Sequence, residues 1–557
     1  MASTVVRGWA EIGERRFRAL IIVVLAIAAE TRFLGLADRS LWFDEAYSVS
    51  VTHGSFLQLV WSVRLFDTHP PLYYALLKGW TLLFGSGEVA VRSLSAVFGV
   101  LVVPLLYGFA RRMADREVAL AGAALLAGSA FAARAAQEAR MYPLLGLLAL
   151  GSWASLRLAL KADRKADRSE EWDKGKPIEA WSGAKVSEEW DKGKQPRARS
   201  WIAYVATTAL MLYTHYFGFL VLGSQALYLV PRLRRDRRTV IAAGLALAVV
   251  LLLFLPWAPA FVSQAVSGRG SPTFRPSVGP AAVVEMLGLF SFGGELFGAA
   301  GYFHVAHISP WMILLLTLPF LALVGAGIYA LRGERAWCLA CYWAAPIAAA
   351  VVVSQRTNIF YPRYFSFLAP AWALLMAAGM DLVARSLPRL PRLRPLGRPA
   401  IAIGVVIAVL AANAPVINGY SWEGNDAYNW RAAAELVTTE AAQNDYLLFV
   451  PGFAQTPFEY YYKGSLERRP LWPVENFLMV RVKKKPDPAI GKAWVLDLAQ
   501  AHPRLWVVAT VPLPDSAFVR LRTLLAPGFV GVRQWDFHYV YVYELRSLRY
   551  KAKAARP

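Results

Sequence analysis

The sequence predicts a mainly α-helical, polytopic membrane protein with about eleven transmembrane helices and a small α/β domain after them. Of its 557 residues, 57% are hydrophobic and only 18% are charged, whereas soluble domains are about half apolar and one quarter charged. The apolar residues gather in runs of about 18 to 22, the length that crosses about 30 Å of hydrocarbon.

Basic clusters at the ends of the apolar runs predict the orientation. They occupy residues 111–112, 234–238 and 385–398, and cytoplasmic loops are enriched in such residues. With a cytoplasmic N-terminus, eleven crossings place all three clusters in the cytoplasm and the C-terminus outside. The net charge of +22 is therefore explained by basic loops that face anionic membrane lipids. No nucleic acid is expected as a partner. The candidate spans lie near residues 18–36, 93–110, 116–133, 141–160, 201–215, 217–231, 239–259, 311–331, 336–353, 364–384 and 400–417.

The chain is expected to divide into a transmembrane domain, 1–418, and an extracytoplasmic α/β domain, 419–557. The transmembrane domain has a long first extracytoplasmic loop, 37–92. It also has a polar cytoplasmic insertion, 161–199, in which Ser-Glu-Glu-Trp-Asp-Lys-Gly-Lys occurs twice. A two-copy repeat of mixed charge predicts a loop insertion here, not a solenoid.

Short patterns in the C-terminal region predict its elements. Residues 430–439 have helical spacing, and residues 446–450 form a short apolar run bounded by Asp445 and Pro451. Residues 505–511 and 539–545 are typical of strands.

Two adjacent carboxylates, Asp44 and Glu45, follow the first span beside Trp42 and Phe43. Carboxylates partly shielded from water at this position suit a general base. The alternative is an interfacial aromatic belt with solvated acids.

His69 lies in the same loop, before two prolines that restrict the backbone to extended conformations. It could bind a phosphate or a metal, although a lone histidine is more often structural. Asp44, Glu45 and His69 together could ligate a divalent ion, but no spacing requires one. No other cofactor is expected.

Further polar residues fall on the same predicted side of the membrane. Charges at the ends of spans are functional candidates by default, although Glu138 and Arg140 could simply pair with each other. The convergence of acids, arginines and histidines from distant segments favours a site. These residues are Glu138, Arg140 and Tyr142 between the third and fourth spans, His215 between the fifth and sixth, and Arg363 and Tyr364 at the start of the tenth.

The ordered set of motifs resembles the membrane glycosyltransferases of the GT-C fold. The similarity is to the family 39, protein O-mannosyltransferase-like branch and to the bacterial aminoarabinose transferase of lipid A, over about the first 420 residues. The motifs that carry it are Arg32, Leu41–Ser48, His69–Leu72, Arg92–Ala96, Glu138–Tyr142, Tyr213–Tyr216 and Arg363–Tyr364, with a weaker likeness at Asn429–Arg431 and Asp445.

This resemblance implies an inverting glycosyltransferase that moves a sugar from a polyprenyl-phosphate donor to an acceptor hydroxyl on the extracytoplasmic face of a bacterial inner membrane. The enzyme would be mannosyltransferase-like, with the sugar itself left open, and the acceptor would be a glycan, lipid or protein. Asp44 would be the base, and Glu45 would assist it or orient the acceptor. Arg140, Arg363 and His69 would neutralise the phosphate. The remaining motif residues expected to bind donor or substrate are Arg92, Glu138, Tyr142, His215 and Tyr364.

Two other functions are compatible with a polytopic protein of this kind. A transporter or flippase of lipid-linked sugars would carry broken helices and polar groups near the bilayer midplane, whereas the candidate charges here lie at span ends. A scaffold without activity would not need an intact Asp44.

Overall fold

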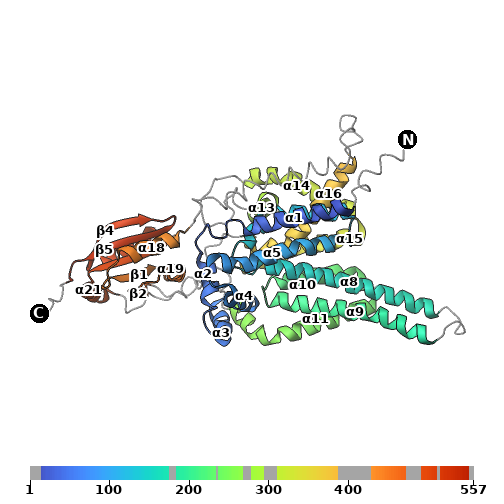
Figure 1. Cartoon of the computed structure of the whole chain (residues 1–557), viewed down its shortest axis with the longest axis horizontal. Helices are drawn as coiled ribbons and strands as arrows, with labels where there is room; N and C mark the ends of the chain where they lie inside the picture. The colour runs from blue at the N-terminus through green and yellow to red at the C-terminus, as the bar shows by residue number, and fades with distance from the viewer. Residues whose placement is uncertain are drawn as a thin grey trace.

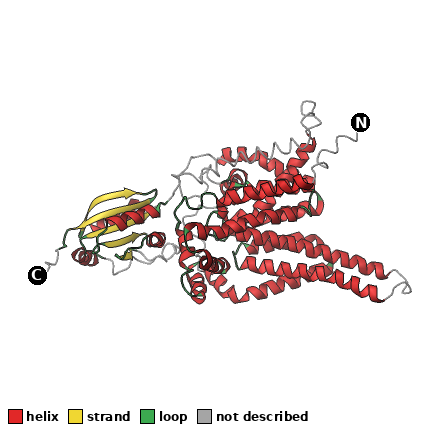
Figure 2. Cartoon of the chain, in the orientation of Figure 1, coloured by secondary structure: helices red, strands yellow, loops and turns green. Residues whose placement is uncertain are grey.

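The computed structural model describes residues 14–174, 183–233, 236–266, 278–293, 310–386, 428–471, 491–510 and 515–550. A bundle of long helices is followed by a small domain with a central sheet, and the two lie end to end (Figures 1 and 2). The predicted boundary between domains at residues 418–419 lies outside the described residues, as does the predicted span 400–417.

The bundle carries nearly all of the helices. Those before the insertion are α1 (Glu14–Phe33), α2 (Phe43–Ser50), α3 (Phe56–Phe66), α4 (Leu72–Phe84), α5 (Glu88–Ala110), α6 (Arg116–Ala127), α7 (Ala130–Ala136) and α8 (Tyr142–Lys174). Those that follow are α9 (Gly183–Leu212), α10 (Gly218–Leu229), α11 (Arg237–Phe254), α12 (Ala258–Val266), α13 (Pro280–Phe292), α14 (Pro310–Leu331), α15 (Gly333–Ser354), the 3₁₀ helix η5 (Pro362–Leu368) and α16 (Ala369–Ser386).

The predicted polytopic helical fold is confirmed. Within the described part of the chain, 6 helical segments are long and apolar enough to cross a membrane, or 7 if the bent pair α6–α7 is one span. The predicted spans 18–36, 201–215 and 217–231 coincide with α1, α9 and α10. The total of about eleven stays a prediction.

The bend of 57° between α6 and α7 is stabilised by Arg32. Carbonyls at the end of a helix lack partners within it. The buried Arg32 guanidinium donates to two of them, Ala127 O at 2.6 Å and Leu126 O at 2.8 Å, and to Gly99 O of α5 at 3.2 Å. This motif residue therefore fixes the start of the bundle and is not exposed to a substrate.

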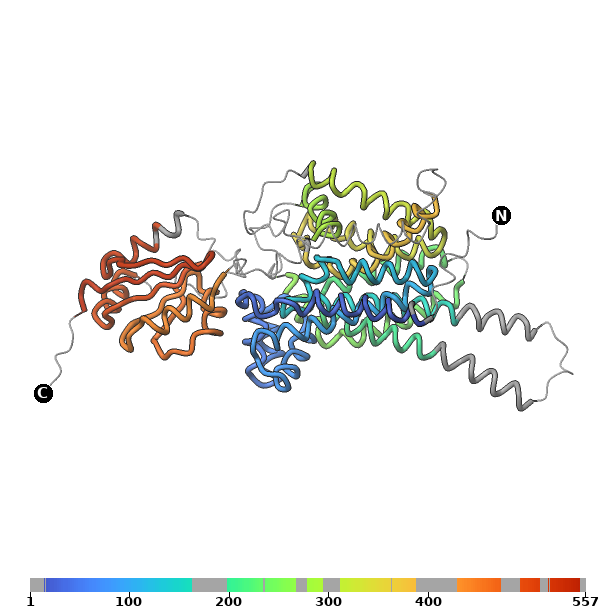
Figure 3. Tube along the Cα trace, turned by 45° about the horizontal axis from the view of Figure 1, so that its top comes forward, coloured from blue at the N-terminus to red at the C-terminus, as the bar shows by residue number. Residues whose placement is uncertain are grey.

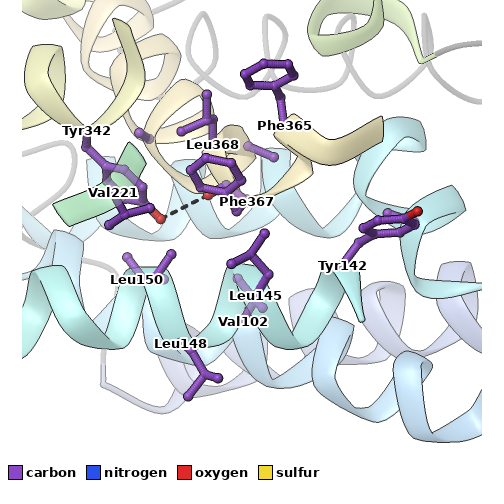
Figure 4. Close-up of a cluster of buried hydrophobic side chains, with 14 of the residues drawn as sticks. Val102, Tyr142, Leu145, Leu148, Leu150, Val221, Tyr342, Phe365, Phe367 and Leu368 are labelled. Carbon is purple, nitrogen blue, oxygen red and sulfur yellow. Dashed lines mark hydrogen bonds between the residues drawn. The ribbon is translucent and has the colours of Figure 1, made fainter. Parts of the chain in front are cut away.

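Aromatic and aliphatic side chains fill the centre of the bundle (Figure 4). Tyr142, Leu145 and Leu150 of α8 line one side, and Phe365 and Phe367 of η5 line the other. The Tyr342 hydroxyl of α15 donates to Phe367 O at 3.0 Å, because a phenol buried in an apolar core requires a partner. The core thus anchors η5, which carries the predicted site residues Arg363 and Tyr364.

Close helix packing explains two glycines. A Cβ at Gly379 of α16 would lie 1.9 Å from Leu323 O of α14, and one at Gly327 would lie 1.9 Å from Leu375 O. Small residues allow transmembrane backbones to approach this closely.

The expectation of a loop at 161–199 is wrong for the described residues. α8 continues to Lys174, α9 begins at Gly183, and the two run side by side beyond the rest of the bundle (Figure 1). Alanine, glutamate, lysine and arginine predominate there, and all of them favour helix over loop.

The C-terminal domain is a five-stranded mixed sheet of order β2-β1-β3-β5-β4 with helices on both faces. The strands β2, β1 and β3 are parallel, and β5 is antiparallel to both β3 and β4. The predicted strands β1 and β3 are buried on both faces, as parallel strands usually are. The elements are α18 (Trp430–Glu440), β1 (Tyr446–Val450), α19 (Gln455–Tyr461), β2 (Glu467–Pro470), α21 (Lys492–Ala501), β3 (Arg504–Thr510), α22 (Asp515–Leu525), β4 (Phe529–Asp536) and β5 (Val540–Ser547).

The first long loop contains three helices, α2 to α4, which cover one end of the bundle. The C-terminal domain lies at this same end, and α1 begins at the opposite end (Figures 1 and 3). We call the end that carries α2 the α2 end. All of the predicted site residues lie there.

Candidate active site

Asp44 lies in the first turn of α2, where the helix dipole favours a negative side chain. Its side chain is 32% exposed. Its closest charged partner is the buried guanidinium of Arg140, with Nη2 3.8 Å from Asp44 Oδ2. This distance is an ion pair without a direct hydrogen bond, so the carboxylate oxygens remain accessible to an incoming hydroxyl.

Glu45, the next residue, is in the opposite situation. Its side chain is 1% exposed, and Arg92 binds both of its oxygens, with Nε to Oε1 at 2.8 Å and Nη2 to Oε2 at 2.7 Å. The amide of Ala139 also donates to Oε1 at 2.9 Å. Glu45 therefore joins α2 to α5 and to the segment before α8, and it does not contact solvent.

Arg92 was expected to bind donor or substrate, and its position contradicts that expectation. Besides Glu45, it donates to the carbonyls of Leu36, Arg39 and Ser40 at 2.7, 2.7 and 3.1 Å. Every nitrogen of this guanidinium is used. The presence of Arg92 in a motif was misleading, because a structural arginine and a substrate-binding arginine look the same in a sequence.

Arg140 lies at the centre of the α2 end, 3% exposed. Its Nη1 has a neighbour at 3.1 Å, the Tyr74 hydroxyl, and longer contacts to Ser48 Oγ at 3.4 Å and Asp44 O at 3.5 Å. Its Nη2 lies 3.4 Å from His69 Nδ1. These contacts are long for a guanidinium, so Arg140 has unused capacity to bind an anion.

Asp67 orients His69. The imidazole Nδ1 lies 2.8 Å from Asp67 Oδ1, which also accepts from the amides of Thr68 and His69, and the Tyr74 hydroxyl donates to Oδ2. A carboxylate partner at 2.8 Å places a proton on Nδ1. The nearby Arg140 Nη2 therefore has no acceptor on this ring, and its other neighbour is Asp44 Oδ2 at 3.8 Å.

The same partners stabilise the charge of Asp67. Burial opposes ionisation, but His69, Arg140 and Tyr74 outweigh it, and together they lower the pKa of Asp67 from 3.8 to about 2. Burial and the charge of Asp67 raise the pKa of the neighbouring Tyr47 well above its usual value.

His215 connects the aromatic residues of the site. Its Nδ1 accepts from the amide of Phe217 at 3.0 Å, so the proton of the neutral ring is on Nε2. Its ring lies 5.1 Å from that of His69 and 5.0 Å from that of Tyr364, and Tyr364 lies 5.8 Å from Tyr142. These predicted residues, from four separate segments, form one cluster behind Arg140.

Arg363 packs against Trp42, two residues before Asp44. Its guanidinium stacks 4.5 Å above the Trp42 ring and forms an ion pair with Glu138, with Nη1 3.6 Å from Glu138 Oε2. Glu138 also pairs with Arg134 at 3.4 Å. The alternative of a Glu138–Arg140 pair is thus not what the structure shows.

Unpartnered polar atoms gather in this cluster. Buried polar groups in native proteins nearly always have a partner, and exceptions often mark a functional site. Most of the atoms concerned are N–H donors, which an anion would satisfy. Among the described residues at the α2 end, the buried side-chain atoms without a hydrogen-bond partner include Arg140 Nε, Arg363 Nη1, His215 Nε2, Trp42 Nε1 and Tyr47 Oη.

The three side chains considered as metal ligands are not brought together. Glu45 is occupied by Arg92, and His69 Nδ1 by Asp67. Over the described ranges, no group of three His, Cys, Asp or Glu side chains has a geometry that could hold a metal ion.

Asp67 and Tyr74 belong to the site, although the sequence reasoning did not single them out. The signal that could have found them is their spacing from His69: an acid two residues before and a tyrosine five residues after, in one short segment. Only the fold shows that these side chains meet, because the first turn of α4 places the Tyr74 hydroxyl against the Asp67 carboxylate.

A family model matches one part of the chain. Residues 68–166 match the family model of dolichyl-phosphate-mannose-protein mannosyltransferase. That range includes His69, Glu138, Arg140 and Tyr142 but stops short of Asp44 on its N-terminal side. A comparison with curated protein sequences gave no match.

Solved structures match over nearly the whole chain. ArnT from Cupriavidus metallidurans in the apo state has a TM-score of 0.61 at 15% identity, covering 95% of this chain and 98% of that one. The same protein bound to undecaprenyl phosphate gives 0.60 at 14% identity, covering 97% and 98%. The oligosaccharyltransferase AglB from Archaeoglobus fulgidus, in complex with an inhibitory peptide and a dolichol-phosphate, gives 0.55 at 12%, covering 97% and 74%. The chain thus has the GT-C fold predicted from its motifs.

Proposed function

We propose that this protein is a glycosyltransferase that moves a sugar from a polyprenyl-phosphate donor to an acceptor hydroxyl, with Asp44 as the general base. The observation that carries the proposal is the cluster of unpartnered N–H donors near a partly exposed carboxylate. Such a site combines a base that can reach an acceptor with groups that can hold a departing phosphate.

In this mechanism, the acceptor oxygen attacks C1 of the sugar while the bond from C1 to the phosphate oxygen breaks. Asp44 takes the proton of the acceptor hydroxyl, and the lipid phosphate leaves with the electron pair of the broken bond. Direct attack from the side opposite the phosphate inverts the configuration at C1. General-base assistance of this kind contributes about 100- to 10,000-fold.

The phosphate would be bound between Arg140 and Arg363. Arg140 lies 3.8 Å from Asp44, Arg363 pairs with Glu138, and each guanidinium has a nitrogen without a hydrogen-bond partner. Donors preorganised for a developing charge are usually the largest contribution in transfers of this kind. The N–H of His215 Nε2 and of Trp42 Nε1 could add neutral hydrogen bonds.

His69 has a supporting role in this proposal. Asp67 fixes the ring with its proton on Nδ1, and a neutral imidazole in that tautomer carries a lone pair on Nε2. Held against His215 and Tyr364, the ring limits where the sugar and phosphate can lie. We assign no such contact to Glu45 or Arg92, whose role is to hold α2 in place.

The ligands of the structurally similar proteins support a lipid-phosphate donor. Solved structures contain ArnT bound to undecaprenyl phosphate and AglB in complex with a dolichol-phosphate. No Gly-rich loop for a nucleotide sugar is found in the sequence. The identity of the sugar and acceptor is left to the assay.

The decisive experiment offers the purified protein, in nanodiscs, several polyprenyl-phosphate sugars with glycan, lipid and protein acceptors. Sugar transfer with release of polyprenyl phosphate is expected for at least one combination, together with inversion at C1. Facilitated movement of the lipid-linked sugar across the bilayer, with no transfer to any acceptor, would refute the proposal in favour of a flippase.

We further propose that the α2 end faces away from the cytoplasm, in the inner membrane of a bacterium. Two exposed residues test this orientation: Glu440, at the end of α18 in the C-terminal domain, and Ala198, in the middle of α9. In intact spheroplasts, Glu440→Cys should react with an impermeant thiol reagent and Ala198→Cys should not. The native cysteines, Cys338 and Cys341, are buried. The reverse pattern of labelling would place the site in the cytoplasm.

A further inference from the structure

The C-terminal domain contacts the segment that leads into Asp44. Residues 38–42 have no regular secondary structure, so their own hydrogen bonds do not fix their shape. Their conformation therefore depends on the groups that bind them from other elements.

Arg92 binds this segment from the side of the bundle. Its guanidinium holds the carbonyls of Arg39 and Ser40. The amide groups of the segment are not reached by Arg92, because a guanidinium is only a donor.

Tyr461, at the end of α19, supplies the missing acceptor. The buried Leu41 amide donates to its hydroxyl at 2.6 Å, and the same hydroxyl donates to Glu88 in the first turn of α5. Glu88 is held in turn by Arg431 of α18, at 2.6 Å. One hydroxyl thus connects the C-terminal domain, the start of α5 and the amide three residues before Asp44.

A second contact supports the same region. Phe453 packs edge-on against Phe43, the residue next to Asp44, with ring centroids 5.4 Å apart. Arg431 also donates through its side chain to Ala37 O at 3.0 Å and through its amide to Ser40 Oγ at 3.3 Å. The C-terminal domain therefore contacts the segment from Ala37 to Phe43 at several points.

We propose that the C-terminal domain sets the position of Asp44, and that Tyr461 is a positioning residue for the transfer reaction. This inference rests on the proposed function for its kinetic consequence. Without the hydroxyl, the buried Leu41 N–H loses its partner, which favours a shifted segment in which the amide is satisfied again. Displacing a catalytic group by about 1 Å can lower a rate by about 100-fold.

Tyr461→Phe tests the proposal, because it removes the hydroxyl and keeps the ring. The matched control is Tyr460→Phe. Tyr460 lies in the same helix and interface, but its hydroxyl donates to Ser86 O at 2.6 Å and does not touch the segment 38–42. Tyr460→Phe loses one hydrogen bond between the domain and the bundle, whereas Tyr461→Phe loses two, those with Leu41 and Glu88.

The expected result is a turnover at saturating donor about 10- to 100-fold lower for Tyr461→Phe, with unchanged donor affinity, and within about twofold of wild type for Tyr460→Phe. Amide hydrogen exchange at Leu41 and the start of α2 should accelerate only in Tyr461→Phe. Equal losses of turnover in both variants would show a general interface effect and overturn the proposal, as would wild-type turnover and exchange in Tyr461→Phe.

The exchange measurement separates this inference from the proposed function. If the wild-type protein transfers no sugar, the proposed function fails. Faster exchange at Leu41 in Tyr461→Phe alone would even then support the positioning contact, and unchanged exchange would refute it.

Discussion

Two arginine centres at the α2 end use the same chemistry for opposite purposes. In the Arg92 centre, each nitrogen donates to an acceptor, and the partner Glu45 is 1% exposed. In the Arg140 centre, contacts are long, Nε is unpartnered, and the partner Asp44 is 32% exposed. Asp44 and Glu45 are adjacent in sequence, yet they belong to different centres.

The difference is one of hydrogen-bond saturation. A buried charge with all of its partners holds a structure in one arrangement, whereas a buried charge with vacant donors is poised for a ligand. Charge at the end of a transmembrane helix therefore identifies a candidate, and only its contacts decide between structural and functional roles. The variants below test that distinction, from the largest expected effect to the smallest.

Asp44→Asn should lower the turnover by about 100- to 10,000-fold, because the shape is kept and the base is lost. Binding of the lipid donor should persist, since Asp44 contributes no positive charge to it. Sugar transfer and donor binding, measured in parallel on purified protein in nanodiscs, provide the check. Near-normal transfer would mean that the base lies elsewhere.

Glu45→Gln should act on the fold instead. Removing one partner of a buried ion pair costs about 3–5 kcal/mol, so thermal unfolding should occur at a clearly lower temperature. Asp38→Asn, in the exposed part of the segment before α2, is the control and should unfold like wild type. A Glu45→Gln protein with normal stability but no sugar transfer would instead show that Glu45 acts in catalysis.

Arg140→Ala and Arg363→Ala should each weaken binding of the sugar donor by about 10- to 100-fold, the value of a charge-assisted hydrogen bond. Lysine at either position should restore only part of the affinity, because it cannot form a bidentate contact. Arg385→Ala is the control, since Arg385 is exposed and pairs with Asp381 and Asp115. Unchanged donor affinity in both alanine variants would show that the donor phosphate does not bind in this cluster.

Asp67→Asn should have the smallest effect, a loss of about 1–3 kcal/mol in unfolding free energy. The pH dependence follows from the lowered pKa. The charged form of Asp67 stabilises the fold above pH 3.8 and loses that effect as the pH falls towards about 2. The stability difference between wild type and variant should therefore shrink as the pH falls below 3.8 towards about 2. A difference that stays constant over that acidic range would contradict the assignment to Asp67.

Sequence reasoning named most of the residues that meet in the candidate site, because the topology brings motif residues at span ends to one side of the membrane. Asp44, His69, Glu138, Arg140, His215 and Arg363 were all expected on one side of the membrane, and they gather at one end of the bundle. Arg92 and Glu45 were expected beside them in substrate-contacting roles. Their pairing with each other could not be read from spacing, since 47 residues separate them.

The sequence by itself determined the polytopic helical fold, the strands β1, β3 and β5, and the identity of the polar residues at the α2 end. These follow from local patterns, because hydropathy, alternation and charge at span ends depend on neighbouring residues only. The tertiary structure alone decided which arginine is saturated and which is open. It also brought Tyr461 to Leu41 across 420 positions, because the partners of a hydrogen bond are chosen by the packing of distant elements.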